Sequence, residues 1–184
     1  PVQLEQITAH AYIEHHPVAH TLLLEGFLNL GQALWGSRTA GVGLLALLQL
    51  LLLAGSFALG VAMLYKRGGS RILPAVVQLW CMLYPFHWYM GVSITKDTIF
   101  TAFFVLQVLA LFSLLEDGGL RVRNGIGFIV STAGMILFRN NGKYAFALLL
   151  AVLAAAVLFT KKRKYFAKLL LWAGAAFLVG NGLL

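Results

Sequence analysis

The chain has 184 residues, of which 60% are hydrophobic and only 11% charged, with a formal net charge of +8. In soluble globular domains about a quarter of all residues are charged, so this composition predicts an integral membrane protein. The basic residues stand in short clusters at the ends of apolar runs, with no basic face interleaved with aromatics, and this excludes nucleic acid as a partner. A single cysteine, Cys81, excludes an internal disulfide.

The first element is an N-terminal polar segment followed by a mixed stretch. Residues 1–20 hold four of the five histidines and two of the six acids. Between residues 21 and 35 the leucines are interrupted by Glu25, Asn29 and Gln32. This stretch is short for a membrane span, which needs about 20 residues, so we expect an amphipathic helix at the interface or against the bundle. The predicted domains are an outer-face loop with an interfacial helix, residues 1–36, and a transmembrane bundle, residues 37–184.

Six clearer apolar runs follow, at about residues 40–65, 72–91, 98–115, 126–138, 144–160 and 169–184. The fourth, of 13 residues, is too short to span unless its neighbours extend it. Pro74 suits a helix start, whereas Pro85 is expected to kink the second run. The predicted fold is an all-α integral membrane protein with about six transmembrane helices and an N-terminal amphipathic, interfacial helix.

The distribution of Lys and Arg predicts the orientation of these runs. The loops after the first, third and fifth runs hold ten of the fourteen basic residues. The positive-inside rule assigns those three loops to the cytoplasm. The N-terminal segment, the Lys96–Asp97 loop and the Arg139–Lys143 loop are then expected on the outer face of the cell membrane.

The first polar segment on that face reads His15-His16-Pro17-Val18-Ala19-His20-Thr21. If Pro17 occupies the first turn of a helix, His16 and His20 lie about one turn apart. Together with Glu14 or His10 they could hold a divalent metal, although no HExxH pattern is present. Two other interpretations stay open: the histidines anchor the chain at the headgroups, or they position a polar substrate and exchange protons with it.

The second polar segment, Lys96-Asp97, opens the third run. Asp97 and Thr98 suit a helix start, where they can cap free N–H groups. A cation at that place gains nothing from the helix dipole, so Lys96 fits better as a partner of a bound anion. Lys96 and the free N–H groups together are a reasonable phosphate site.

The third polar segment is Arg139-Asn140-Asn141-Gly142-Lys143-Tyr144. Its Asn-Gly pair predicts a tight turn with positive φ, which reverses the chain after Phe138. Arg139 and Lys143 could simply extend to lipid headgroups. Alternatively, Arg139 offers a planar donor fork to a phosphate or diphosphate, and the two asparagines contact phosphate or sugar hydroxyls.

The order of these motifs, HHPxxHT, then PxHW followed by TKDxxF, then RNNGxY, resembles a group of bacterial multi-spanning proteins related to GT-C glycosyltransferases. The matching residues are His15, His16, Pro17, His20, Thr21, Lys96, Asp97, Phe100, Arg139, Asn140, Asn141, Gly142 and Tyr144.

The resemblance implies a polyprenyl-phosphate sugar donor used at the outer face, with its head bound by Arg139 and Lys96 and its tail among the helices. The family's catalytic acid lies in the first outer loop, where only Glu5 and Glu14 occur here and neither clearly matches. The chain lacks an initiator methionine and a signal peptide and stops within an apolar run, so we expect a piece of a longer protein. If the family's catalytic acid lies upstream, this piece holds the donor half of the site.

The sequence predicts two sets of site residues. The predicted catalytic residues are Glu14, His16, His20 and Asp97. The predicted substrate-binding residues are Lys96, Arg139, Asn140, Asn141, Lys143 and Tyr144. The expected partners are a polyprenyl-phosphate-linked sugar and membrane lipids, with no cofactor except a divalent metal if His16 and His20 hold one. One alternative is a transporter or lipid-handling protein, although the predicted spans contain no charged residue in mid-membrane, where translocation sites usually have one. The other alternative is a non-catalytic structural subunit.

Overall fold

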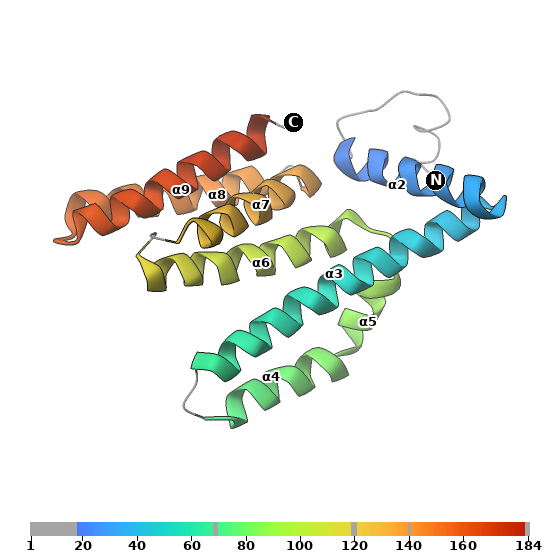
Figure 1. The fold of residues 1–184 in the computed structure, drawn as a ribbon, viewed down its shortest axis with the longest axis horizontal. Coiled ribbons are helices and arrows are strands. Elements are labelled where there is room, and N and C mark those ends of the chain that lie inside the picture. The colour runs from blue at the N-terminus through green and yellow to red at the C-terminus, as the bar shows by residue number, and fades with distance from the viewer. Residues whose placement is uncertain (1–17, 68–69, 119–120, 140, 183–184) are drawn as a thin grey trace. The chain divides into compact units, whose positions relative to one another are not determined.

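The computed structural model of the chain describes residues 18–67, 70–118, 121–139 and 141–182. Within these ranges the chain is helical and has no β-strand, which confirms the predicted all-α class (Figure 1). The helices in chain order are α2 (Val18–Trp35), α3 (Arg38–Arg67), α4 (Ile72–Leu83), α5 (Pro85–Val92), α6 (Lys96–Asp117), α7 (Val122–Phe138), α8 (Gly142–Phe159) and α9 (Arg163–Gly182).

Three of these helices are long and apolar enough to cross a membrane: α3 with 30 residues, α6 with 22 and α8 with 18. At 1.5 Å per residue α3 is about 45 Å long and α6 about 33 Å, whereas a bilayer has a hydrocarbon core of about 30 Å. Helices α4 and α7 are apolar but shorter. The described chain is therefore an all-helical membrane protein with three candidate spanning helices.

The second predicted run is two helices, because the chain breaks between α4 and α5. Proline has no N–H to donate and forces an extended conformation on the residue before it. Tyr84 accordingly has φ −71° and ψ 112°, and α5 begins at Pro85. The indole Nε1 of Trp88 crosses the break and donates to the carbonyl oxygen of Met82 at 2.7 Å. The kink predicted at Pro85 is thus a complete interruption, stabilised by one side chain.

The chain divides into two compact units, Pro1–Ala102 and Phe103–Leu184, and the boundary lies inside α6. The first unit contains α2 to α5 and the start of α6. The second contains the rest of α6 and α7 to α9. The predicted division at residues 36 and 37 falls at the turn between α2 and α3 and stays a prediction.

In the first unit, α2 and α3 form a closely packed helical hairpin. Gly36, with a φ of 64°, lies in the turn between them. The backbones approach each other at Gly31 and Gly41, where an added Cβ on Gly41 would collide with the carbonyl oxygen of Phe27. The buried apolar core of this hairpin is Leu24, Leu28 and Leu45. The antiparallel arrangement of α2 and α3 is therefore set by direct backbone contact.

In the second unit, α9 packs against both α7 and α8. Helix α7 is buried along the whole stretch from Ser131 to Ile136. One phenylalanine ring from each helix joins the three: the Phe128 and Phe146 ring centroids lie 5.8 Å apart, and those of Phe146 and Phe177 lie 6.2 Å apart. These helices form one packed group, at one end of which the α7–α8 turn carries the third polar segment.

Candidate functional site at the start of α6

The start of α6 is fixed by polar side chains from α3 and from α6 itself. Gln49 Nε2 donates to the carbonyl oxygen of Thr95 at 3.2 Å, and the hydroxyl of Thr98 donates to the carbonyl oxygen of Met90 at 2.7 Å. Gln49 and Thr98 are both fully buried. Buried polar groups of this kind hold a backbone segment in one position, since leaving them unpaired costs about 1–3 kcal/mol each.

Lys96 and Asp97 occupy the first turn of α6, and both are half-buried. The helix start predicted at Asp97 and Thr98 is therefore confirmed within two residues. The first-turn N–H groups of a helix have no partner within the helix and favour a negative charge. A phosphate placed there would meet these N–H groups and the Lys96 ammonium together.

His20 and Thr21 belong to the same unit and are buried, each with 1% of its surface exposed. Leu24 packs against Leu45 in the hairpin core, and Ile94 packs on that core. His20 lies one turn before Leu24, and Gln49 lies one turn after Leu45. In an antiparallel helix pair these two turns adjoin, so His20 comes to the level of Gln49, which bonds the segment before α6.

Two residues of this region were not among the predicted site residues, although Thr21 belongs to the first polar segment. The Thr21 hydroxyl and the Gln49 Oε1 atom are buried, and no hydrogen-bond partner for either occurs in the described part of the chain. Most buried polar atoms in proteins are paired, so an unpaired buried atom is a candidate for a hydrogen bond to a ligand or to a water molecule. The signal was present in the sequence as a glutamine within a 26-residue apolar run, but a polar residue in such a run does not reveal which neighbour it faces.

The third polar segment joins α7 to α8 in the second unit. Arg139 is exposed, and its carbonyl oxygen accepts from the Gly142 N–H at 2.8 Å. Asn141 and Tyr144 are exposed, whereas Lys143 is half-buried, with its Nζ 5.5 Å from the centroid of the Tyr144 ring. The predicted Asn140 lies outside the described residues. The cationic and amide groups expected of this segment are therefore accessible, apart from those of residue 140.

The prediction of a positive φ at the Asn-Gly pair was wrong. Gly142 is the first residue of α8, and its N-cap Asn141 has the right-handed helical values φ −76° and ψ −12°. Glycine is required there for a different reason: an added Cβ would lie 2.9 Å from the carbonyl oxygen of Met135. Close approach of α8 to α7, rather than turn geometry, selects this residue.

The metal interpretation rests on residues that the structure describes only in part. Within the described ranges no group of three or more His, Cys, Asp or Glu side chains is close enough to hold a metal ion. His16 and Glu14, two of the predicted catalytic residues, lie outside those ranges. A His16–His20 metal site therefore stays a prediction.

Comparison with known proteins places the chain in a family. The family model of DUF6020, a family of unknown function, matches residues 8–183. The chain belongs to this family. No curated protein and no solved structure matches it. The DUF6020 match covers all three polar segments, including the complete first one from His15 to Thr21, so these segments are part of the family domain.

Proposed function

We propose that this DUF6020 chain is a GT-C-like glycosyltransferase that uses a polyprenyl-phosphate sugar donor at the outer face of the cell membrane. The observation that carries the proposal is the start of α6. There Lys96 follows Thr95, whose carbonyl oxygen accepts from the buried Gln49 amide, and the Gln49 Oε1 has no partner in the described chain. The cation and N–H groups suit the donor phosphate, and the amide oxygen suits a sugar hydroxyl.

The chain path supports an outer-face position for this site. Helices α3, α6 and α8 are candidate spans, and we propose that the α4–α5 pair, α7 and α9 cross as well, giving six crossings. The loops around residues 66–71, 117–123 and 160–168 then share one face and carry ten basic residues. By the positive-inside rule that face is cytoplasmic, and the turns at Lys96 and Arg139 are on the other face.

The proposed chemistry assigns roles to the predicted residues. Lys96 and Arg139 neutralise the phosphate, and Asn141 and Tyr144 contact the sugar. An acceptor hydroxyl attacks the anomeric carbon while the bond from that carbon to the phosphate oxygen breaks, and the polyprenyl phosphate leaves. A carboxylate, Asp97 or Glu14, takes the hydroxyl proton. His16 and His20 position the reacting groups.

The test is sugar transfer by the full-length protein in vesicles supplied with radiolabelled polyprenyl-phosphate hexoses. Losing one charge-assisted hydrogen bond costs about 1.5–3 kcal/mol, so Lys96→Gln and Arg139→Ala should each lower turnover roughly 10- to 100-fold. Lys164→Gln and Arg163→Ala are matched controls, because both residues are exposed at the basic start of α9. Equal turnover in all four variants would refute the assignment of Lys96 and Arg139 to the site. Failure of the wild type to bind any such donor would refute the proposed glycosyltransferase function.

A further inference from the structure

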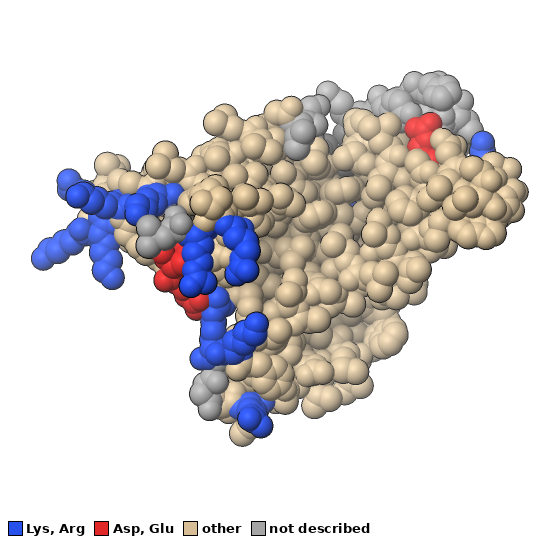
Figure 2. All heavy atoms as spheres, viewed as in Figure 1, with Lys and Arg blue, Asp and Glu red and all other residues tan. Residues whose placement is uncertain are grey.

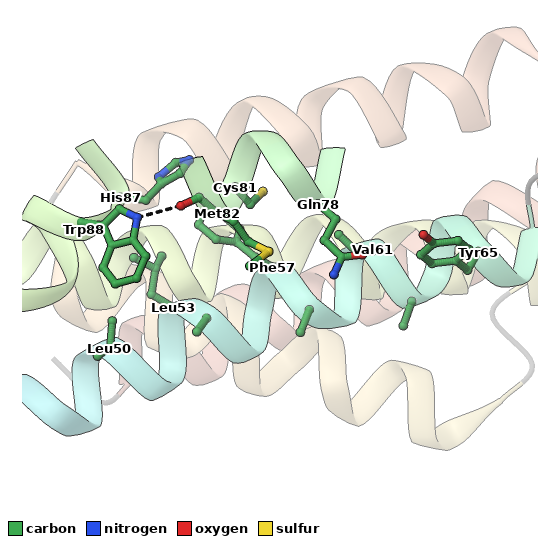
Figure 3. A pocket seen from close by; sticks show the side chains of 13 residues that line it. Leu50, Leu53, Phe57, Val61, Tyr65, Gln78, Cys81, Met82, His87 and Trp88 are labelled. Carbon is green, nitrogen blue, oxygen red and sulfur yellow. Dashed lines mark hydrogen bonds between the residues drawn. The ribbon is translucent and has the colours of Figure 1, made fainter. Parts of the chain in front are cut away.

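A long groove lies between α3 and the α4–α5 pair, entirely within the first unit (Figure 3). Its volume is about 490 Å³, inside the range of about 300–1,000 Å³ typical of ligand sites. Figure 3 shows Leu50 and Trp88 at one end, Tyr65 at the other and Gln78 between them. The lining is predominantly apolar, so the groove suits a hydrocarbon rather than a polar ligand.

The groove follows one face of α3 for most of the thickness of a membrane. Its lining on α3 runs from Leu50 to Tyr65, which at 1.5 Å per residue is about 22 Å. The hydrocarbon of one leaflet is half of a core of about 30 Å, hence about 15 Å deep. Counted from Tyr65, about 15 Å corresponds to about ten residues of α3, so an acyl chain of one leaflet would reach close to Ala54 and remain inside the groove.

Small side chains keep this part of the groove open. Ala54, Ala58 and Ala62 line it and are exposed, whereas Leu53 and Val61 beside them are buried. These alanines and their apolar neighbours offer water no hydrogen-bond partners, so this stretch of the groove suits hydrocarbon better than water. In a membrane the available filler is lipid hydrocarbon.

The far end of the groove is held open by contacts of α5. The Trp88 indole bonds the Met82 carbonyl across the Pro85 break, and the His87 ring lies 4.8 Å from the Phe57 ring, centroid to centroid. The first contact joins α5 to α4 and the second joins α5 to α3, and neither involves a ligand. The groove is therefore formed before a lipid enters it.

The Tyr65 end of the groove opens at a cationic turn. Lys66 and Arg67 form the last turn of α3, and Arg71 is the N-cap of α4. Figure 2 shows blue atoms at this turn between α3 and α4. Lys66 and Arg71 are both exposed at this turn. Basic pockets between membrane helices bind anionic lipid headgroups.

We propose that this groove binds one anionic phospholipid from the leaflet that faces Lys66. Its acyl chain lies along Ala62 and Ala58, and its phosphate lies at Lys66 and Arg71. The lipid enters from the end opposite to the Lys96 turn, so this site is separate from the proposed donor site and does not depend on it.

The test is native mass spectrometry of the full-length protein in detergent, titrated with phosphatidylglycerol or phosphatidylcholine. The wild type should retain one phosphatidylglycerol at least tenfold better than phosphatidylcholine. Ala58→Leu fills the groove and should abolish retention of both, whereas Ala155→Leu makes the same change at an exposed site on α8 and should not. Lys66→Gln with Arg71→Gln should remove the headgroup preference, unlike Lys161→Gln with Lys164→Gln.

Three results would overturn the proposal. The first is equal retention of the two lipids by the wild type. The second is equal phosphatidylglycerol retention by Ala58→Leu and Ala155→Leu, with thermal unfolding showing both variants folded. The third is a dimer that Ala58→Leu converts to monomer without any change in lipid retention, because the groove would then hold a second copy of the chain.

Discussion

Replacing Gly41 by alanine tests the α2–α3 contact that brings His20 to the level of Gln49. The added Cβ would collide with the backbone carbonyl of Phe27 and approach Leu28 Cα to 2.9 Å. Neither atom belongs to a side chain that can rotate away. Helix α2 must therefore shift along its length, or the hairpin must bear the strain.

The size of the effect follows from comparison with Gly43→Ala. A Cβ at Gly43, two residues further along α3, meets nothing within 4 Å. Both variants gain about 1 kcal/mol of helix propensity over glycine, but only Gly41→Ala adds an overpacking cost of roughly 1–3 kcal/mol. The propensity gains cancel in the comparison, so Gly41→Ala should be about 1–3 kcal/mol less stable than Gly43→Ala. At about 2–4 °C per kcal/mol for a chain of this size, its Tm should be about 2–12 °C lower.

The assay is thermal unfolding of the full chain in one detergent, followed by far-ultraviolet circular dichroism. Gly43→Ala should unfold at or slightly above the wild-type temperature, and Gly41→Ala clearly below it. Indistinguishable Tm values for the two variants would mean that α2 does not pack on α3 at Gly41. The inference that His20 lies at the level of Gln49 would then be wrong as well.

Two further predictions concern the ends of helices. Thr98→Val removes the 2.7 Å bond that holds the start of α6 to α5 and should lower the free energy of unfolding by about 1 kcal/mol. Thr101→Val removes only a bond to a carbonyl of its own helix and should change unfolding less; equal losses in urea titrations would contradict this. Gly142→Ala brings a Cβ to 2.9 Å from an α7 carbonyl and should lower Tm, whereas Gly174→Ala has open space and should not. A neutral Gly142→Ala would show that α8 does not approach α7 so closely.

The helices themselves were predictable from runs of apolar residues, because each buried or lipid-facing helix needs such a run. The run at about residues 40–65 corresponds to α3, Arg38–Arg67. The 13-residue run at 126–138 is extended by one turn at its start, to Val122. That turn contains Asn124, whose amide donates to Asp117 at 2.6 Å. A local pattern cannot show a polar partner on another helix, so the extension was not predicted.

The candidate site was only partly predictable for the same reason. Lys96 and Asp97 stood out because charge is rare in this chain, and a helix start depends on local residues. The burial of Gln49 and Thr21 was not predicted because it depends on how α2, α3 and the segment before α6 pack together. Gly142 was misread because its Asn-Gly context is a turn signal, whereas the actual requirement is the nearby carbonyl of Met135.

We propose that Lys96 and Arg139 face the same side of the membrane, which is required if both bind one donor. The direct measurement is labelling of single-cysteine chains in intact cells with a membrane-impermeant maleimide, in a Cys81→Ser background. Thr95→Cys and Asn141→Cys should both label from outside, and Lys162→Cys only after the membrane is permeabilised. Labelling of positions 95 and 141 from opposite sides would contradict the claim, because no single phosphate could then meet both Lys96 and Arg139.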